Sequence, residues 1–484
     1  MSAGLRLAIA AVVLLGLGGL GWWASRHAEG VPGPSADAAP ADAPAAHEDP
    51  ARHDAPRPVA RGPNILLFTI DTLRGDHVGA AGYPRAVTPN LDALAARGAY
   101  FSRAYAPSAW TAPSLVSLLT SVIPDEHGVQ RGHPFMARIV AQETIAEGLP
   151  SLASGLREAG YLTVGVTANG HLLPELGFER GFDRYTCAGF VGVDQLGPAV
   201  QATLPVLARA EEPFFLWVHA LDPHTPYAPL GPALETFWPA DQPRFAELAA
   251  VPFPEGYALA LGGRLPNDDE RAFLVAAYDA DVRTVDDYLG ELLAALSGEP
   301  LVVVVASDHG EEFAEHGRHG HGHQLYDETV RVPLVIALPD AAPQRIATPV
   351  SLIDVLPTLL ELAGAPPAPL ARGRSLGPAL RGEPLDPAPI VLETSRLEDV
   401  RALVDGDWKY IERRAPEPRA QLFDLAADPG ERHDLSAERP EELERLRARL
   451  TSELEGAASR RPVPVTVPLD EATLERLRAL GYGH

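Results

Sequence analysis

Aspartate and histidine residues stand at the ends of three apolar runs in this chain of 484 residues. In chain order they are Asp71 after the first run, His219, Asp222 and His224 at the second, and Asp308 and His309 after the third. Carboxylates and imidazoles are common ligands of divalent cations. The single cysteine, Cys187, excludes a cysteine-rich metal site and a disulfide framework within the chain. An Asp-His pair after one strand is also typical of a turn, but three such ends favour a shared site.

A hydroxyl residue precedes a predicted helix in "SAWTAPSLVSLLTS", residues 108–121. Pro113 suits a first helical turn, and the leucines that follow give an apolar face at helical spacing. Thr111 therefore lies just before a helix N-terminus, where exposed N–H groups and the helix dipole favour an anion. Its hydroxyl is either a group that acts on phosphate or sulfate, or only an N-cap.

Histidines crowd the glycine-rich stretch "EHGRHGHGHQLYDETVRVPL". They are His316, His319, His321 and His323. Such a loop is either a solvated surface or a source of ligands and catalytic groups. The aspartates and histidines at three strand ends favour the second interpretation.

These residues need a scaffold, which the alternation of apolar strands and amphipathic helices predicts. "NILLFTI", "LTVGVTA", "PFFLWVHAL" and "PLVVVVASDHG" are typical of buried parallel strands, and helical patterns such as "SLASGLREAGY" lie between them. We expect an α/β fold whose large, mostly parallel sheet is sandwiched between helices, with ligands at the carboxyl ends of the strands. This catalytic domain is expected over residues 63–384, followed at 385–484 by a small antiparallel-sheet subdomain with a terminal helix, Pro440–Leu454.

The net charge and the N-terminal residues limit the partners and the location that can be expected. A formal charge of −25 and a pI near 5.0 argue against a nucleic-acid partner. Residues 7–24 form an uncharged apolar run that predicts a membrane anchor within residues 1–30, with a cleaved signal peptide and a core helix as alternatives. The Ala/Pro-rich stretch 31–62 is typical of a linker. These features predict a membrane-anchored, extracytoplasmic protein, which is periplasmic or secreted if the segment is cleaved.

Several motifs together resemble the sulfatase family of the alkaline phosphatase superfamily. "PNILLFTIDTLRGDHVGAAGY" resembles its first metal-binding strand, "TPNLDALAARGAYFSRAYAPSAWTAPSLVSLLTS" its nucleophile segment, and "ASDHGEEFAEHG" its second metal strand. "SLIDVLPTLLELAG" and "GDWKYI", with "LFDLAADPGE" after it, resemble the C-terminal part. The resemblance covers about residues 63–435 in order.

The resemblance implies roles for individual residues. The implied metal ligands are Asp71, Thr111, Asp308 and His309, and the implied catalytic residues are Thr111 as nucleophile with His224, His321 and His323. His224 matches a histidine that binds the transferred group, and His321 or His323 stands near a position where many members have a lysine. Asp222 and His219 are expected to contact substrate, although Asp222, His224 and His323 could also complete a second ion site. Thr72 falls where many sulfatases have a second metal-binding aspartate.

The chain departs from the sulfatase pattern at the nucleophile itself. Sulfatases convert a Cys or Ser within C/S-x-P-S-R to formylglycine, whereas this chain has Thr111 and, in place of the arginine, Leu115. We therefore expect no formylglycine. We expect a hydrolase or transferase that acts on phosphate or sulfate esters through Thr111 and a divalent cation (Ca, Zn or Mn). Its substrate would be a small molecule, glycan or lipid headgroup. The alternatives are a sulfuric ester hydrolase without formylglycine and a catalytically inactive member that binds an anionic glycan or lipid.

Overall fold

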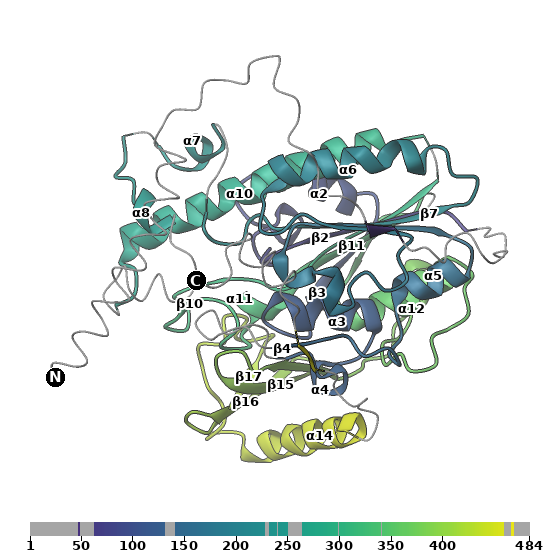
Figure 1. Ribbon diagram of the computed structural model, residues 1–484. Coiled ribbons are helices and arrows are strands. Elements are labelled where there is room, and N and C mark those ends of the chain that lie inside the picture. The colour runs from purple at the N-terminus through teal and green to yellow at the C-terminus, as the bar shows by residue number, and fades with distance from the viewer. Residues whose placement is uncertain are drawn as a thin grey trace. The chain divides into compact units, whose positions relative to one another are not determined.

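A ten-stranded sheet forms the centre of the protein (Figure 1). The computed structural model describes residues 47–48, 62–130, 141–227, 232–239, 241–249, 264–298, 300–339, 341–458 and 466–468. Residues 44–484 form one compact unit. The sheet strands are β1 (His47–Glu48), β2 (Asn64–Ile70), β3 (Ala99–Tyr105), β5 (Leu162–Thr167), β6 (Arg184–Cys187), β7 (Phe214–Ala220), β8 (Leu301–Ser307), β11 (Arg331–Ala337), β12 (Gln344–Ile346) and β13 (Val350–Ser351).

The sheet is mostly parallel, as the sequence predicts. The strand order is β1-β6-β5-β7-β2-β8-β11-β3-β12, and β13 also pairs with β3. The central strands β6, β5, β7, β2 and β8 are parallel, whereas β11 is antiparallel to both of its neighbours and β1 is antiparallel to β6. Because β5, β7, β2 and β8 are adjacent and parallel, the residues that follow them meet at one edge.

Helices cover both faces of this sheet and bury alternate residues of each strand. On one face, Leu67 and Trp217 pack with α3 (Thr111–Thr120), α5 (Leu152–Glu158) and α12 (Val355–Leu362). On the other, Leu66 and Phe68 pack with α2 (Pro89–Ala95), α6 (Val193–Leu207) and α10 (Asp268–Ala295). Burial on two faces explains why these strands are continuous apolar runs rather than alternating ones.

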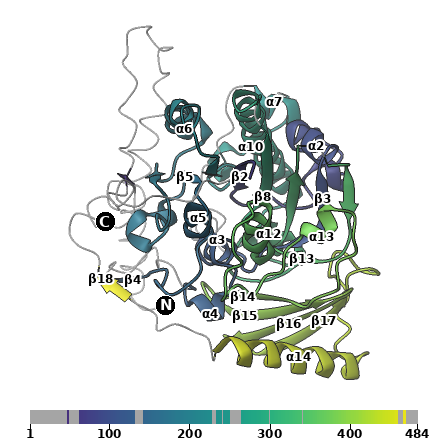
Figure 2. The same cartoon turned by 90° about the vertical axis from the view of Figure 1, so that its right-hand side faces the viewer.

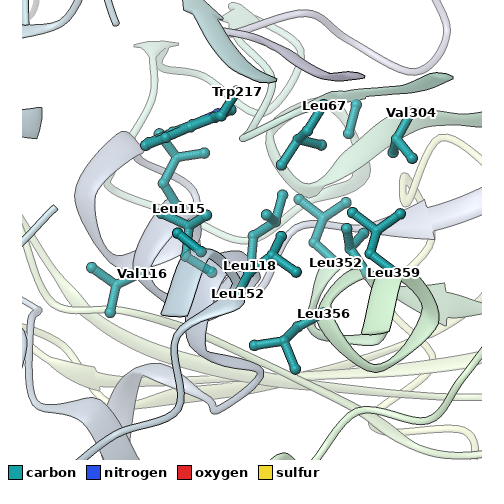
Figure 3. Close-up of a cluster of buried hydrophobic side chains, with 14 of the residues drawn as sticks. Leu67, Leu115, Val116, Leu118, Leu152, Trp217, Val304, Leu352, Leu356 and Leu359 are labelled. Carbon is teal, nitrogen blue, oxygen red and sulfur yellow. The ribbon is translucent and has the colours of Figure 1, made fainter. Parts of the chain in front are cut away.

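The helix α3 lies deep in the first of these cores (Figure 3). All ten of its residues are buried, and its side chains at Leu115 and Leu118 pack between the sheet and α12. The N-terminal end of α3 is therefore held rigidly relative to the strands.

A second, four-stranded antiparallel sheet follows in the chain, as the sequence predicts (Figure 2). Its strands are β14 (Ile390–Thr394), β15 (Asp399–Asp405), β16 (Trp408–Ala415) and β17 (Arg419–Asp424). One face carries α14 (Pro440–Ala458) through Leu446 and Leu450. The opposite face packs against Tyr105, at the end of β3, and against Leu325 and Val330, which follow the histidine-rich loop in the chain. The second sheet therefore supports that loop directly.

The remaining elements are short. The helices are α4 (Pro124–His127), α7 (Ala233–Phe237), α8 (Ala246–Ala249), α11 (Asp327–Val330) and α13 (Gly377–Leu380), with 3-10 turns η2 (Gly79–Ala81), η3 (Gly170–Leu172), η4 (Pro174–Leu176) and η5 (Leu352–Asp354). The short strands are β4 (Ala141–Glu143), β9 (Glu312–Phe313), β10 (His319–Gly320) and β18 (Thr466–Pro468).

The expectation of a membrane-anchored protein is corrected. Among the described residues, no helix combines the length and the apolar character needed to cross a bilayer. The apolar run 7–24 and the linker 31–62, except Gly62 and residues 47–48, lie outside the described residues.

Candidate active site

Four adjacent parallel strands bring polar residues to one edge of the main sheet. Asp71 follows β2, His219 is near the end of β7, Asp308 follows β8, and Asn169 lies two residues after β5. All four side chains are buried. The carboxyl-end rule for parallel sheets thus accounts for the position of the cluster.

Two carboxylates and one imidazole in this cluster can hold a cation. Ligand atoms of Asp71, His219 and Asp308 lie within 4.8 Å of one another. Asp71 Oδ1, Asp308 Oδ2 and His219 Nε2 are buried without a hydrogen-bond partner. Burying two unpaired carboxylates side by side is costly, and a divalent cation would remove that cost. The donor set therefore fits a divalent metal ion.

The pKa directions agree with this crowding. Burial and the neighbouring Asp71 charge raise the pKa of the Asp308 carboxyl well above its usual range. Burial opposes ionisation of Asp71, but His224, His219 and His309 outweigh it and lower the pKa of Asp71. The shifts in the two pKa values have opposite signs, and a bound cation would favour the ionised form of both carboxyls.

Thr111 lies against the carboxylates and is not an N-cap. The helix α3 begins at Thr111 itself, and its N-cap residue is Trp110, which makes no side-chain capping bond. Thr111 Oγ1 is 3.4 Å from Asp71 Oδ2 and 3.4 Å from His309 Nε2. The hydroxyl thus faces both the candidate ion site and the helix N-terminus, where an anion is favoured.

Two neighbours orient the metal-ligand candidates. His309 Nδ1 lies 2.9 Å from the carbonyl oxygen of Gly310, so Nε2 faces Asp71 at 3.5 Å. Burial lowers the pKa of His309 to about 4. Thr72 supplies no carboxylate here, but its backbone amide donates to Asp308 Oδ1 at 3.2 Å, and its buried hydroxyl makes no hydrogen bond.

Of the histidine-rich loop, His321 reaches the cluster. Its ring lies 4.4 Å from that of His309 and 5.0 Å from that of His224, and its Nδ1 is 2.9 Å from Glu311 Oε1. Burial, followed by the other histidines, lowers the pKa of His321 well below its usual range. His224 in turn has Nδ1 2.5 Å from the carbonyl oxygen of Thr225.

His323 faces another way. Its Nε2 is 3.1 Å from Glu312 Oε2 and its Nδ1 is 3.2 Å from the carbonyl oxygen of His321. His316 also belongs to a different group, where its Nδ1 lies 2.6 Å from Glu328 Oε1. These contacts favour His321 over His323 as the loop residue that meets a substrate.

The two residues expected to contact substrate have structural partners. Asp222 Oδ2 accepts a 2.7 Å hydrogen bond from the amide of Val193, the first residue of α6. Burial raises the pKa of Asp222 to about 6. His219 has Nδ1 2.9 Å from Thr69 Oγ1 and Nε2 3.4 Å from Asp71 Oδ2, which brings it to the candidate ion site.

Sequence reasoning missed Asn169 and Glu311. Asn169 Nδ2 donates to Asp71 Oδ2 at 2.7 Å and lies 3.5 Å from Thr111 Oγ1. The strand-end rule could have found Asn169, because it follows the predicted strand "LTVGVTA". Glu311 is fully buried behind His321, and its acidic neighbours in the sequence gave no signal that separated it from them.

Comparisons with known proteins identify the family that this fold and sequence match. The sulfatase family model matches residues 63–365, and the model of the C-terminal part of N-sulphoglucosamine sulphohydrolase matches residues 314–460. A choline-sulfatase of Rhizobium meliloti is 29% identical over 448 residues, which cover 78% of this chain and 83% of that protein. A solved 2-O GAG sulfatase has a TM-score of 0.67 at 23% identity, covering 85% of this chain and 96% of that one. The phosphonate monoester hydrolase of Agrobacterium radiobacter has a TM-score of 0.63 at 20% identity, and the match covers 84% of this chain and 100% of that one.

Proposed function

This chain belongs to the sulfatase family, whose members are metal-dependent hydrolases of sulfate or phosphate esters, and we propose that it hydrolyses phosphate esters with Thr111 as its nucleophile. The observation that carries this proposal is the position of the Thr111 hydroxyl, buried and 3.4 Å from both Asp71 and His309 at the start of α3. We further propose that the domain boundary lies between residues 384 and 385, as the sequence suggests.

Asp71, Asp308, His309 and Thr111 are the proposed holders of the divalent cation, and His219 Nε2 is an additional candidate. When bound, the cation supplies positive charge that lowers the pKa of a hydroxyl and neutralises oxygens of the ester. Asn169 donates to the Asp71 oxygen that also lies nearest Thr111, so it fixes the orientation of that carboxylate.

The proposed reaction has two steps. Thr111 Oγ1 attacks phosphorus and loses its proton, the bond from phosphorus to the ester oxygen breaks, and the leaving oxygen takes up a proton. Water then attacks the phosphothreonine, restoring the Thr111 hydroxyl and releasing inorganic phosphate. His224 and His321 are the proposed groups that bind the phosphoryl oxygens and handle these protons. The N-terminus of α3 adds favourable interaction with negative charge on the transferred group.

A sulfuric ester hydrolase without formylglycine is the second candidate, since the curated relative described above is a choline-sulfatase. Thr111 cannot give the aldehyde on which formylglycine chemistry depends, and Leu115 replaces the motif arginine. Hydrolysis of a sulfated threonine would lack the carbonyl-hydrate route. These departures favour phosphate esters. A third candidate, an inactive member that binds an anionic glycan, is disfavoured by the buried carboxylate pair.

A substrate panel tests the proposal. The metal-loaded full chain is assayed with 4-nitrophenyl phosphate, bis(4-nitrophenyl) phosphate, 4-nitrophenyl phenylphosphonate and 4-nitrophenyl sulfate. We expect turnover of at least one phosphorus ester to exceed that of the sulfate. Mass spectrometry of rapidly quenched reactions should find the group transferred from the substrate on the peptide that contains Thr111: phosphate from the monoester, 4-nitrophenyl phosphate from the diester and phenylphosphonate from the phosphonate ester. Sulfate ester turnover without phosphoester turnover would support the sulfuric ester hydrolase. A purified protein that holds no metal ion and turns over none of the esters would support the inactive, anion-binding member.

A further inference from the structure

An arginine from the second sheet reaches the histidine side of the candidate active site. Arg396 lies in the turn between β14 and β15. That turn is tied to Gly322, since the amide of Leu397 and the hydroxyl of Thr394 both donate to the Gly322 carbonyl oxygen, at 3.4 and 3.2 Å. Gly322 separates His321 from His323, so the turn is attached to the histidine-rich loop beside the site.

Trp110 holds the guanidinium of Arg396 in place. The guanidinium carbon is 5.1 Å from the centroid of the Trp110 ring, a cation–π distance. Trp110 is fully buried and directly precedes Thr111. The arginine stem crosses Gly322 closely: a Cβ added there would lie 3.2 Å from Arg396 Cδ and 3.8 Å from Trp110 Cβ. Gly322, with φ +82°, therefore leaves space for the arginine as well as allowing the turn.

Arg396 brings a permanent positive charge to the histidine side of the site. The charge of Arg396 is one of the causes, after burial, that lower the pKa of His309 and of His321, which agrees with its position near these rings. An arginine stays charged at any pH at which the protein is folded.

We infer that Arg396 is a specificity-determining residue that binds a negatively charged group, such as a carboxylate, on the leaving-group part of the substrate. The inference rests on the proposed function. The transferred group itself lies at Thr111, among the Asp71–Asp308 pair and the start of α3, whereas Arg396 is anchored over Trp110, to one side of that centre. A planar guanidinium held by an aromatic face is suited to bidentate binding of a carboxylate.

Calorimetric binding of three non-hydrolysable probes tests this inference without relying on turnover. The probes are phenylphosphonate and its carboxylated forms, 3- and 4-phosphonobenzoate, each titrated into the full chain loaded with the cation that elemental analysis identifies. We expect the wild type to bind at least one phosphonobenzoate about tenfold more tightly than phenylphosphonate, a ratio typical of one good charged contact.

Arg396→Ala should abolish that preference while changing the dissociation constant of phenylphosphonate less than about threefold. Arg396→Lys keeps the charge without the planar fork and should retain part of the preference. Arg414→Ala removes an exposed arginine of β16 and is the matched control for net charge. This variant should keep the full preference for a phosphonobenzoate. Thermal unfolding of each variant shows whether it is folded, and Arg396→Gln, which keeps the stem, replaces Arg396→Ala if that variant is not.

The outcomes separate this inference from the proposed function. Equal affinity for all three probes in the wild type, or a preference that survives Arg396→Ala, contradicts the proposed role of Arg396. Neither result contradicts the proposed phosphoester function. Equal weakening of all three probes in Arg396→Ala also overturns the proposed role of Arg396, since the arginine would then bind the transferred group. Failure of the metal-loaded wild type to bind any probe contradicts both the inference and the proposed phosphoester function.

Discussion

At the scale of single residues, the proposed chemistry depends on the Thr111 hydroxyl, which lies beside buried charged groups. Thr111 Oγ1 lies between an Asp71 oxygen and His309 Nε2, and Asn169 donates to that same Asp71 oxygen. Each neighbour constrains the hydroxyl from a different strand end. A small change at this position therefore affects reactivity far more than folding.

Thr111→Ala should lose at least about a thousandfold in turnover, which corresponds to roughly 4 kcal/mol of activation free energy. The fold should survive, because Thr111 does not cap α3 and its removal leaves no capping bond unmade. Steady-state kinetics and urea unfolding measure the two effects separately. Thr111→Ser, which keeps a hydroxyl, is the matched control and should retain part of the activity. Unchanged turnover in Thr111→Ala would exclude it as the nucleophile.

Asp308→Ala should remove the metal ion and activity together. Its Oδ2 has no hydrogen-bond partner and lies next to Asp71, and the neighbouring His309 cannot replace its negative charge. Elemental analysis after gel filtration measures the occupancy. The control is Asp286→Ala, which removes a buried carboxylate bonded to the amides of Asn90 and Leu91 in α2 and should keep the metal ion. Full occupancy in Asp308→Ala would mean that this carboxylate does not bind the ion.

The sequence predicted part of this cluster. The types and strand-end positions of Asp71, Asp308 and His309 were sufficient, because parallel strands place such residues at one edge. Which histidine of a flexible glycine-rich sequence turns inward was not predictable, since Glu311 and Glu312 each attract a different one. Asn169 was missed because an amide is a weaker chemical signal than a carboxylate.

At the scale of elements, the helix α3 has a core residue, Leu115, where the formylglycine motif has an arginine. Leu115 is fully buried in the core shown in Figure 3, at the position where the formylglycine motif has an arginine. The side chain at this position therefore contributes to packing between the sheet and α12. Restoring the motif would place a charge in an apolar core.

Leu115→Arg should destabilise the fold by several kcal/mol, a large part of the stability of an ordinary domain. Urea unfolding or, if the variant is insoluble, its soluble fraction measures this loss. Leu370→Arg makes the same change at a leucine that is 49% exposed and should be close to neutral. A stable, fully folded Leu115→Arg protein would show that α3 tolerates the arginine and that packing does not explain its absence.

Glu393 links the second sheet to α4 and carries a pH dependence of stability. Its Oε2 accepts from the amide of Asp125, its Oε1 makes no hydrogen bond, and burial raises its pKa from 4.5 to about 7. The folded state thus holds this proton more tightly than the unfolded chain does. The resulting stability is fully present below pH 4.5 and is lost as the pH rises through about 7.

Because each unit of pKa shift corresponds to about 1.4 kcal/mol, the Glu393 carboxyl should lower the free energy of unfolding of the wild type by about 3 kcal/mol between pH 4.5 and pH 8. Glu393→Gln lacks this carboxyl and should not show that decrease. Urea unfolding of variant and wild type at both pH values gives the difference. Glu417→Gln, at an exposed position, should parallel the wild type. If the wild type and Glu393→Gln differ equally at the two pH values, the Glu393 carboxyl does not titrate in this range.

The elements themselves were mostly predictable from periodicity, but the direction of β11 was not. Buried apolar runs identified β2, β5, β7 and β8, and their parallel pairing followed from the helices between them. The apolar sequence of β11 gives no sign that it runs antiparallel to β8 and β3. Strand direction depends on the connection, and β11 follows β8 through the irregular histidine-rich loop rather than a crossover helix.

At the scale of the whole molecule, the formal charge of −25 opposes the anionic esters that the site is proposed to bind. Charge that is spread over the surface acts over a Debye length, about 30 Å at 0.01 M salt and about 8 Å at 0.15 M. The cation site, Arg396 and the start of α3 act over contact distances, where salt screens them less. Long-range repulsion and short-range attraction therefore respond differently to ionic strength.

We expect kcat/KM for 4-nitrophenyl phosphate to rise about two- to tenfold between 10 and 150 mM NaCl at saturating metal ion, because screening removes the long-range repulsion between a negative protein and a negative substrate. The change should appear mainly as a lower KM. The value of kcat should change little, because it refers to the complex, in which the ester has already overcome the long-range repulsion. Repeating the series with choline chloride separates screening from a specific effect of sodium. A fall in kcat/KM over this range would mean that the positive potential of the site extends beyond the acidic surface and steers the substrate, in which case the net charge of the chain has no bearing on its encounter with the ester.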